Sequence, residues 1–144
     1  MRILGIDYGS KRIGLAVSDE TGMLAQGLDY LPGGSVESVC CEIIKLAAER
    51  RVGAIVVGVP VRLSGQPSEQ TERTLKFIAA LERATNVPVH RWDERLTTVQ
   101  AERALLEADL RRKDRKEKRD RLAAQLMLQS YLDAKNPPSN VESF

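Results

Sequence analysis

Residues 1–19 restrict the possible fold more than any other stretch of this 144-residue chain. They predict two strands joined by a tight loop, because residues 3–6 form a largely apolar run and residues 13–18 alternate with the period of a strand. Asp7 ends the first run with a charge at a position where burial is expected. Since a buried carboxylate costs free energy unless a partner compensates it, we expect Asp7 to meet an arginine or a metal ion.

The following residues predict a third strand and then an alternation of helices and strands. A third extended run covers residues 24–31, and apolar residues recur on one helical face after Ser35, which is a suitable helix cap. Residues 54–59 are apolar without alternation, which is typical of a parallel strand covered on both faces. Another helix is expected after Ser68, and residues 87–91 predict a short strand.

Two more helices are expected in the last third of the chain. Thr97 followed by Gln100 fits a capping box, so a helix should begin there and run to about residue 108. The last helix should cover residues 118–134. This order predicts an α/β fold: a mixed five-stranded sheet, in which an antiparallel three-strand meander is joined by two further strands, with helices on both faces. It is the element order of a ribonuclease H-like fold.

Length and composition agree with one globular domain. We expect it to fill residues 1–135, with residues 136–144 as a frayed tail. Hydrophobic residues make up 42% of the chain and charged residues 29%, and no window approaches the ~20 apolar residues of a membrane span. The chain enters a strand at once, so we expect no signal peptide. Cys40 and Cys41 are adjacent, a spacing that suits neither a disulfide framework nor a metal site, and we therefore expect a reduced, cytoplasmic protein.

Three carboxylates occupy the ends of predicted elements. Asp7 ends the first strand, Glu94 follows the fifth strand, and Asp120 opens the last helix. Along that helix Asp120 shares a face with Ala124 and Met127, so it should point toward the sheet. Three acids that converge repel one another unless they hold hard cations such as Mg²⁺ or Mn²⁺, which take oxygen ligands. Two such ions about 4 Å apart would clamp the attacking and leaving oxygens of a phosphodiester.

Each acid also has an ordinary structural interpretation. Asp7 could close the turn that follows it, Glu94 could pair with a nearby arginine, and Asp120 could favour a helix N-terminus. Neighbouring acids compete for the same roles, because Asp93 precedes Glu94 and Asp19 ends the second strand. A shared site accounts for all three positions at once.

The net charge of +2 does not by itself indicate a nucleic-acid-binding protein, but the charge is unevenly distributed. Eight Lys and Arg residues gather between residues 110 and 122, a cluster that suits either a phosphate-binding segment or a solvated linker between helices. The candidate phosphate contacts are Arg111, Arg112 and Lys113 in this segment, Lys11 and Arg12 in the loop after the first strand, and Arg95 after the fifth strand.

These residues resemble the YqgF family, bacterial Holliday-junction resolvases that are also described as pre-16S ribosomal RNA nucleases. The matching stretches span nearly the whole chain in the family's order, and the most specific is DERLTT at residues 93–98. The other matching stretches are residues 5–9 with 12–14, residues 57–60, and residues 118–124 with 131–132. The resemblance implies a fold similar to ribonuclease H, with Asp7, Glu94 and Asp120 as its catalytic and metal-binding acids. It also implies a cytoplasmic protein that acts on structured DNA or RNA with a divalent metal, Mg²⁺ or Mn²⁺.

The leading hypothesis is therefore a metal-dependent endonuclease that cuts precursor rRNA or a four-way DNA junction, as a monomer or homodimer without membrane association. A non-catalytic nucleic-acid-binding module of the same fold is one alternative. The other is a fragment of an actin-like ATPase, because residues 7–11 resemble the phosphate loop of that class. Such ATPases close on the nucleotide with a second, similar half, for which 144 residues leave no room. The resemblance favours Glu94 over Asp93 and Asp7 over Asp19.

Overall fold

The computed structural model describes residues 1–97 and 115–136, with side chains for residues 1–97 and 121–136. The strands are β1 (Arg2–Tyr8), β2 (Arg12–Ser18), β3 (Ala25–Pro32), β4 (Val52–Val59) and β5 (Val89–Asp93). The helices are α1 (Val36–Glu49), α2 (Glu69–Ala84) and α4 (Arg115–Lys135), and η1 (Glu94–Leu96) is a single 3-10 turn. The helix predicted to begin at Thr97 and the basic residues 111–113 fall outside the described part of the chain.

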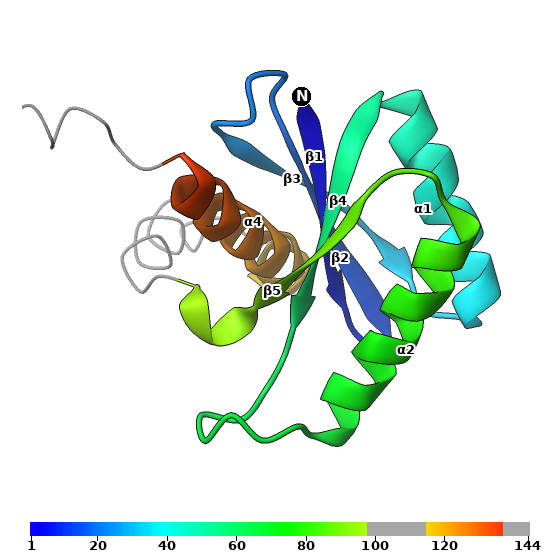
Figure 1. Cartoon of the computed structure of the whole chain (residues 1–144), viewed down its shortest axis with the longest axis vertical. Coiled ribbons are helices and arrows are strands. Elements are labelled where there is room, and N and C mark those ends of the chain that lie inside the picture. The colour runs from blue at the N-terminus through cyan, green and yellow to red at the C-terminus, as the bar shows by residue number, and fades with distance from the viewer. Residues whose placement is uncertain (98–114, 137–144) are drawn as a thin grey trace, which may run out of the picture.

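The strands form one mixed sheet in the order β3-β2-β1-β4-β5. β1 pairs antiparallel with β2, and β2 with β3, which confirms the predicted meander. β4 lies parallel to β1, and β5 lies parallel to β4. Because parallel neighbours end at the same edge of a sheet, the carboxyl ends of β1, β4 and β5 lie side by side (Figure 1).

Helices α1 and α2 cover one face of the sheet, and α4 covers the other (Figure 1). The apolar stripe predicted for α1 is buried against the sheet, with Val39, Cys40, Ile43 and Ala47 in the core. Cys41, beside this stripe, is exposed. The two adjacent cysteines are thus one core residue and one surface residue, and the predicted placement of helices on both faces is confirmed.

Helix α4 packs closely on β1, β2 and β3. Gly5 of β1 makes this approach possible, because a β-carbon built there would lie 2.9 Å from Cβ of Leu128. Two glutamines of α4 also bond the backbone of Ala25 at the start of β3. Gln125 Nε2 donates to the carbonyl oxygen of Ala25 at 3.1 Å, and the backbone amide of Ala25 donates to Oε1 of Gln129 at 2.9 Å. Among the described helices, none is long and apolar enough to cross a membrane.

Candidate active site

Two of the predicted acids meet at the carboxyl edge of the sheet. Asp7 lies near the end of β1, where it pairs with Gly14 of β2. Strand β5 ends at Asp93, beyond the predicted end at residue 91, so Glu94 follows the strand directly as the first residue of η1. β4 lies between β1 and β5 in the sheet. The side chain of Glu94 reaches across β4 and shares a hydrogen bond with Asp7.

Gly58 of β4 provides the space in which Glu94 crosses the sheet. A β-carbon built on Gly58 would lie 2.7 Å from Oε1 of Glu94 and 3.2 Å from Cγ of Met127 on α4. Any side chain at this position would therefore displace the carboxylate. Sequence reasoning did not single out Gly58 as a site residue, although a glycine inside a buried apolar strand is a sign that another group approaches closely.

The contact changes the acidity of Glu94. Burial, and after it the negative charge of Asp7, raise the pKa of Glu94 to about 7 from an ordinary value of 4.5. The hydrogen bond with Asp7 acts in the same direction, and the charge of Asp93 adds to it. When no cation is bound, the two carboxyl groups therefore share a proton near neutral pH, which relieves the repulsion between them.

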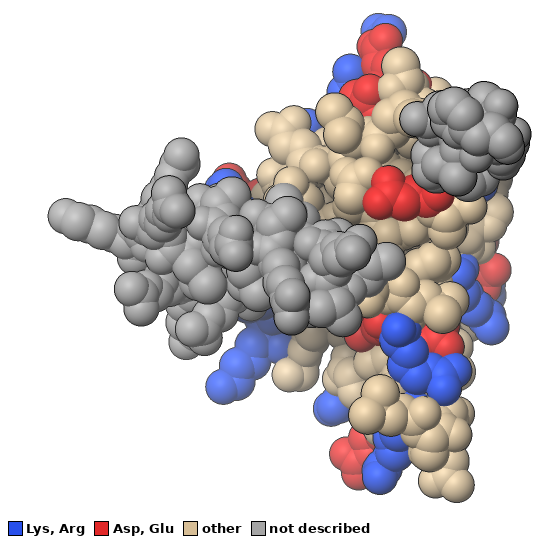
Figure 2. Space-filling model, turned by 90° about the vertical axis from the view of Figure 1, so that its left-hand side faces the viewer, with Lys and Arg blue, Asp and Glu red and all other residues tan. Residues whose placement is uncertain are grey.

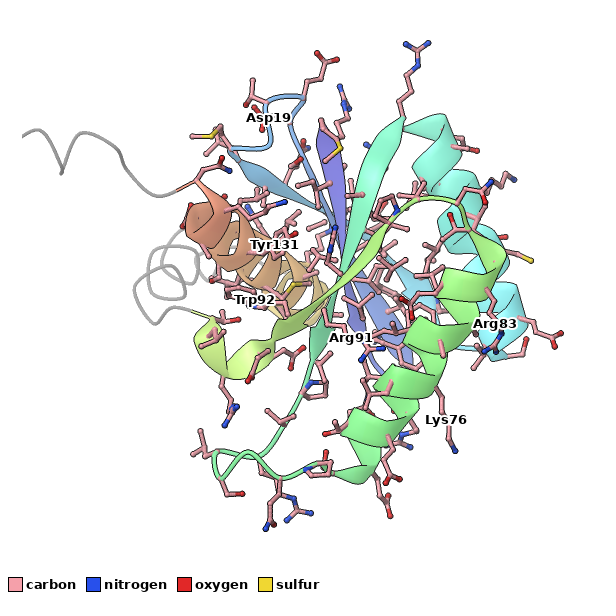
Figure 3. The ribbon with its side chains drawn as sticks, viewed as in Figure 1. Asp19, Lys76, Arg83, Arg91, Trp92 and Tyr131 are labelled. Atoms are coloured by element: carbon pink, nitrogen blue, oxygen red, sulfur yellow. The ribbon has the colours of Figure 1, made fainter. Side chains whose placement is uncertain are left out.

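The acids that compete with this pair have structural roles. Asp93 accepts hydrogen bonds from the backbone and the side chain of Arg95, and the side-chain bond most strongly lowers the pKa of Asp93. Asp19 accepts hydrogen bonds from the turn over residues 21–24, and the bond from Thr21 most strongly lowers the pKa of Asp19. Asp19 also lies at the end of the sheet opposite to η1 (Figure 3). Neither carboxylate is directed into the pair, so the geometry favours the two acids that the resemblance selected.

The third predicted acid, Asp120, belongs to the N-terminal part of α4, and its side chain is not among those that the structure describes. Ala124 and Met127, one and two turns further along, are buried against the sheet, as predicted for the face that Asp120 shares with them. Over residues 1–97 and 121–136, no group of three or more His, Cys, Asp or Glu side chains is arranged to hold a metal ion. The convergence of Asp120 on the other two acids stays a prediction.

The N-terminus of α2 is tied to the edge at which the acids lie. Gln70 Nε2 donates a hydrogen bond to the carbonyl oxygen of Tyr8 at 2.6 Å. The hydroxyl group of Thr71 donates to the carbonyl oxygen of Pro60. These two bonds hold the backbone just past Asp7 in β1 and just past Gly58 in β4. Helix α2 therefore supports the strand ends at which the acid pair lies.

The basic residues predicted to contact nucleic acid have different surroundings. Lys11 is exposed in the β1–β2 loop, and the guanidinium of Arg12 lies 5.0 Å from the ring centre of Tyr30. Arg95 forms an ion pair with Asp93. Figure 2 shows Lys and Arg side chains interspersed with acidic ones on one face of the molecule, not in an uninterrupted patch. Lys11 and Arg12 thus lie on the hairpin that follows β1, at the same edge as the acid pair.

The chemistry of the donors suits a hard divalent cation. Asp7 and Glu94 both present carboxylate oxygens, which are the ligands that Mg²⁺ and Mn²⁺ prefer. A cation at the pair would replace the shared proton, because its charge favours the ionised form of Glu94. The residues present therefore fit the predicted ion.

Comparison with known sequences gives consistent matches over nearly the whole chain. A family model described as RuvX, Holliday junction resolvase, matches residues 1–134. A protein of Pelotomaculum thermopropionicum with the name "Putative pre-16S rRNA nuclease" is 46% identical over 143 residues, which cover 96% of this chain and 90% of the relative.

Solved structures with a similar fold include two proteins in complex with Holliday junctions. RuvC of T. thermophilus in complex with a Holliday junction substrate has a TM-score of 0.59 at 18% identity, covering 94% of this chain and 97% of RuvC. The fowlpox virus resolvase in complex with Holliday junction DNA has a TM-score of 0.58 at 12% identity, covering 94% of this chain and 99% of the resolvase. These similarities confirm the predicted fold class.

Proposed function

The chain belongs to the RuvX family of Holliday junction resolvases, and we propose that it hydrolyses phosphodiester bonds in structured nucleic acid with Mg²⁺ or Mn²⁺. The observation that carries this proposal is the contact of Glu94 with Asp7 across Gly58 at the carboxyl edge of the sheet. A pair of partly buried acids destabilises the fold unless a cation compensates its charge. A metal-binding role accounts for the pair, and Asp120 of α4 completes the proposed ligand set.

The residues of the chain divide into those that hold the cation and those that hold the substrate. Asp7, Glu94 and Asp120 would bind Mg²⁺ or Mn²⁺, which supplies positive charge at the phosphate and makes a bound water more acidic. Glu94 must be ionised to act as a ligand, so it releases its proton on metal binding. Lys11 and Arg12 bind backbone phosphates beside the acids, and so orient the scissile group.

The names of the relatives favour one substrate over another. We propose a precursor of 16S rRNA as the substrate, because the 46% identical relative that carries this name is matched over 90% of its length. A four-way DNA junction is the second candidate, because the description of the family model names it. Either substrate is consistent with a cytoplasmic protein, which we propose acts as a monomer or a homodimer.

Cleavage of both substrates by the purified protein, measured side by side, tests the proposal. We expect precursor rRNA to be cut in Mn²⁺ or Mg²⁺ and not in chelator. The substitutions Asp7→Asn, Glu94→Gln and Asp120→Asn should each abolish cleavage and leave substrate binding intact, because each removes a metal ligand. Asp29→Asn is the matched control, because Asp29 is a surface acid on the edge strand β3, where it pairs with Arg121 of α4.

Each contrary outcome has a distinct meaning. Full activity in one of the three variants would remove that residue from the site. Cleavage of the four-way junction alone would assign a DNA substrate. Binding of both nucleic acids without cleavage under any metal would identify a non-catalytic binding module, and binding of fluorescent ATP instead would favour the ATPase alternative.

A further inference from the structure

We propose that Asp93 and Arg95 form a clamp that positions Glu94, so that Arg95 serves the metal site and does not contact nucleic acid. The two residues flank Glu94 in the chain and hold each other across it. The proposal rests on the proposed function, because it concerns the same carboxylate pair. It changes the role expected for Arg95, which the sequence suggested as a phosphate contact.

Four hydrogen bonds join Asp93 and Arg95 in the clamp. Oδ1 of Asp93 accepts hydrogen bonds from the backbone amide of Arg95 at 2.9 Å and from its Nε at 3.1 Å. Oδ2 accepts from Nε at 3.0 Å and from Nη2 at 2.6 Å. A guanidinium bound at two nitrogens has a fixed orientation as well as a charge partner. Both oxygens of Asp93 are therefore engaged by one residue.

This arrangement fixes the backbone on both sides of Glu94. Asp93 is the last residue of β5 and also caps η1 through the amide of Arg95. The amide of Thr97 donates to the carbonyl oxygen of Glu94 at 3.1 Å, which closes the turn. With its neighbours held, the side chain of Glu94 leaves the turn in one direction, across Gly58 toward Asp7.

The clamp also separates two adjacent acids by function. A free carboxylate at Asp93 would lie next to Glu94 and compete with it for a cation. Its pairing with Arg95 satisfies both of its oxygens and compensates its charge. Arg95 is directly adjacent to Glu94 in the sequence but turns its guanidinium to Asp93, and this leaves the carboxylate of Glu94 to Asp7.

The outer side of Arg95 lies against the loop that follows β4. A β-carbon built on Gly65 would lie 3.3 Å from Nη1 of Arg95. The loop is closed by hydrogen bonds from the amide of Gly65 to the carbonyl oxygen of Arg62 at 2.7 Å, and from the amide of Arg62 to the carbonyl oxygen of Gln66 at 3.0 Å. Gly65 has φ of 87°, which a glycine adopts without strain. The guanidinium is thus bordered by Asp93 on one side and by an ordered loop on the other.

A second ion pair on β5 provides a matched control. Arg91, labelled in Figure 3, pairs with Glu82 of α2 through a single contact of 3.8 Å, and both side chains are about half exposed. Such a pair contributes little to stability, and it lies on the same strand as the clamp. Glu82→Gln therefore removes an ion pair from β5 without touching η1.

The test compares Arg95→Gln, Asp93→Asn, the double variant and Glu82→Gln with the wild type. Asparagine caps a helix as well as aspartate does, so Asp93→Asn keeps the turn while it weakens the pair. We expect Arg95→Gln to lower kcat about 10- to 100-fold, because a displaced carboxylate misplaces the reacting groups. The rise in melting temperature with Mn²⁺ should shrink in parallel, while substrate Kd and its salt dependence stay unchanged. The double variant should be no worse than Arg95→Gln, because the two residues act as one unit, and Glu82→Gln should match the wild type.

Three results would overturn the clamp. If Arg95→Gln weakens substrate binding and lowers the salt slope by ~0.9, with the Mn²⁺ response intact, Arg95 is a phosphate contact. If Arg95→Gln has the same kcat and the same Mn²⁺ response as an active wild type, the clamp has no positioning role. A wild type that neither cleaves nor responds to Mn²⁺ would contradict the proposed function, and the clamp with it.

Discussion

The proton shared by Glu94 and Asp7 makes the stability of the metal-free protein depend on pH. Glu94 titrates at about 7 in the native state, against 4.5 for an ordinary glutamate. Between these pH values the native state binds more protons than the unfolded state, so the free energy of unfolding falls as pH rises through this range. We expect a fall of about 1–2 kcal/mol, because water reaches a half-buried carboxylate and weakens the effect of the shift. Thermal melts in chelator between pH 4 and pH 8 measure this fall. A stability that does not change with pH over this range would contradict the prediction.

Removing one charge of the pair should stabilise the protein while it destroys the site. Asp7→Asn keeps the shape of the side chain and removes its repulsion of Glu94, so we predict a gain of about 1 kcal/mol at pH 8 in chelator. Mn²⁺ should raise the melting temperature of the wild type much more than that of the variant, because it binds the folded site. Melts of both proteins, each with chelator and with Mn²⁺, provide the four values. A variant that melts lower in chelator, with equal shifts by Mn²⁺, would make Asp7 a structural turn residue.

The glycine beneath Glu94 allows a test by steric displacement. Gly58→Ala would place a β-carbon 2.7 Å from Oε1 of Glu94, a flexible end that moves aside more easily than backbone. We predict a loss of about 10- to 100-fold in kcat with a small change in melting temperature. Gly27→Ala is the control, since Gly27 also lies under α4, on β3, where a β-carbon would lie 3.3 Å from both Cβ and the backbone oxygen of Arg121. Equal activity in both variants would show that Glu94 is not held over Gly58.

At the scale of elements, the position of α4 depends on its contact with β1. Leu128 is fully buried and lies directly over Gly5. We predict that Leu128→Ala lowers the free energy of unfolding by about 2–5 kcal/mol, because it leaves a cavity between helix and sheet. Leu128→Met keeps the volume and should cost less than about 1.5 kcal/mol. Chemical denaturation of the two variants measures the difference, and equal losses would mean that α4 is held mainly by its polar contacts with β3.

The boundary between β5 and η1 shows where local pattern stops being informative. The apolar pattern predicted a strand that ends at residue 91, but β5 continues through Trp92 and Asp93. Trp92 packs edge-on against Tyr131 of α4, with ring centres 5.8 Å apart (Figure 3). Both added residues also pair with β4, Trp92 with Gly58 and Asp93 with Val59. This pairing between distant segments extends the strand, and it cannot be seen in a window of neighbouring residues. The predicted end of the strand was therefore displaced, while the placement of Glu94 after the strand was correct.

At the scale of the whole molecule, the distribution of charge matters more than the net charge of +2. We predict that changing Arg111, Arg112 and Lys113 together to Ala weakens binding to similar extents across nucleic-acid sequences. The salt slope should flatten by ~0.9 for each phosphate of duplex DNA that the variant no longer neutralises. The control changes the exposed residues Lys45, Lys76 and Arg83 of α1 and α2 to Ala, on the face opposite to α4; Lys76 and Arg83 are labelled in Figure 3. Binding titrations of both triple variants at several salt concentrations measure the affinity and the salt slope. An unchanged slope in the variant of residues 111–113 would make that segment a linker.

Local patterns in the sequence were enough to predict the succession of elements and the two acids at the strand ends. Apolar periodicity and helix caps such as Ser35 and Ser68 act between near neighbours, so they can be read without the fold. The same local signals placed Asp7 and Glu94 at strand ends, and the strand order then implied that these ends meet.

The choice between neighbouring acids and the environment of Glu94 depend on contacts between distant segments of the chain. It is Glu94 and not Asp93 that reaches Asp7, because Gly58 in a third strand leaves room for one carboxylate and Arg95 holds the other. The raised pKa of Glu94 was decided in the same way, since the burial and the charge that cause it come from strands that are distant in the sequence and adjacent only in the folded sheet.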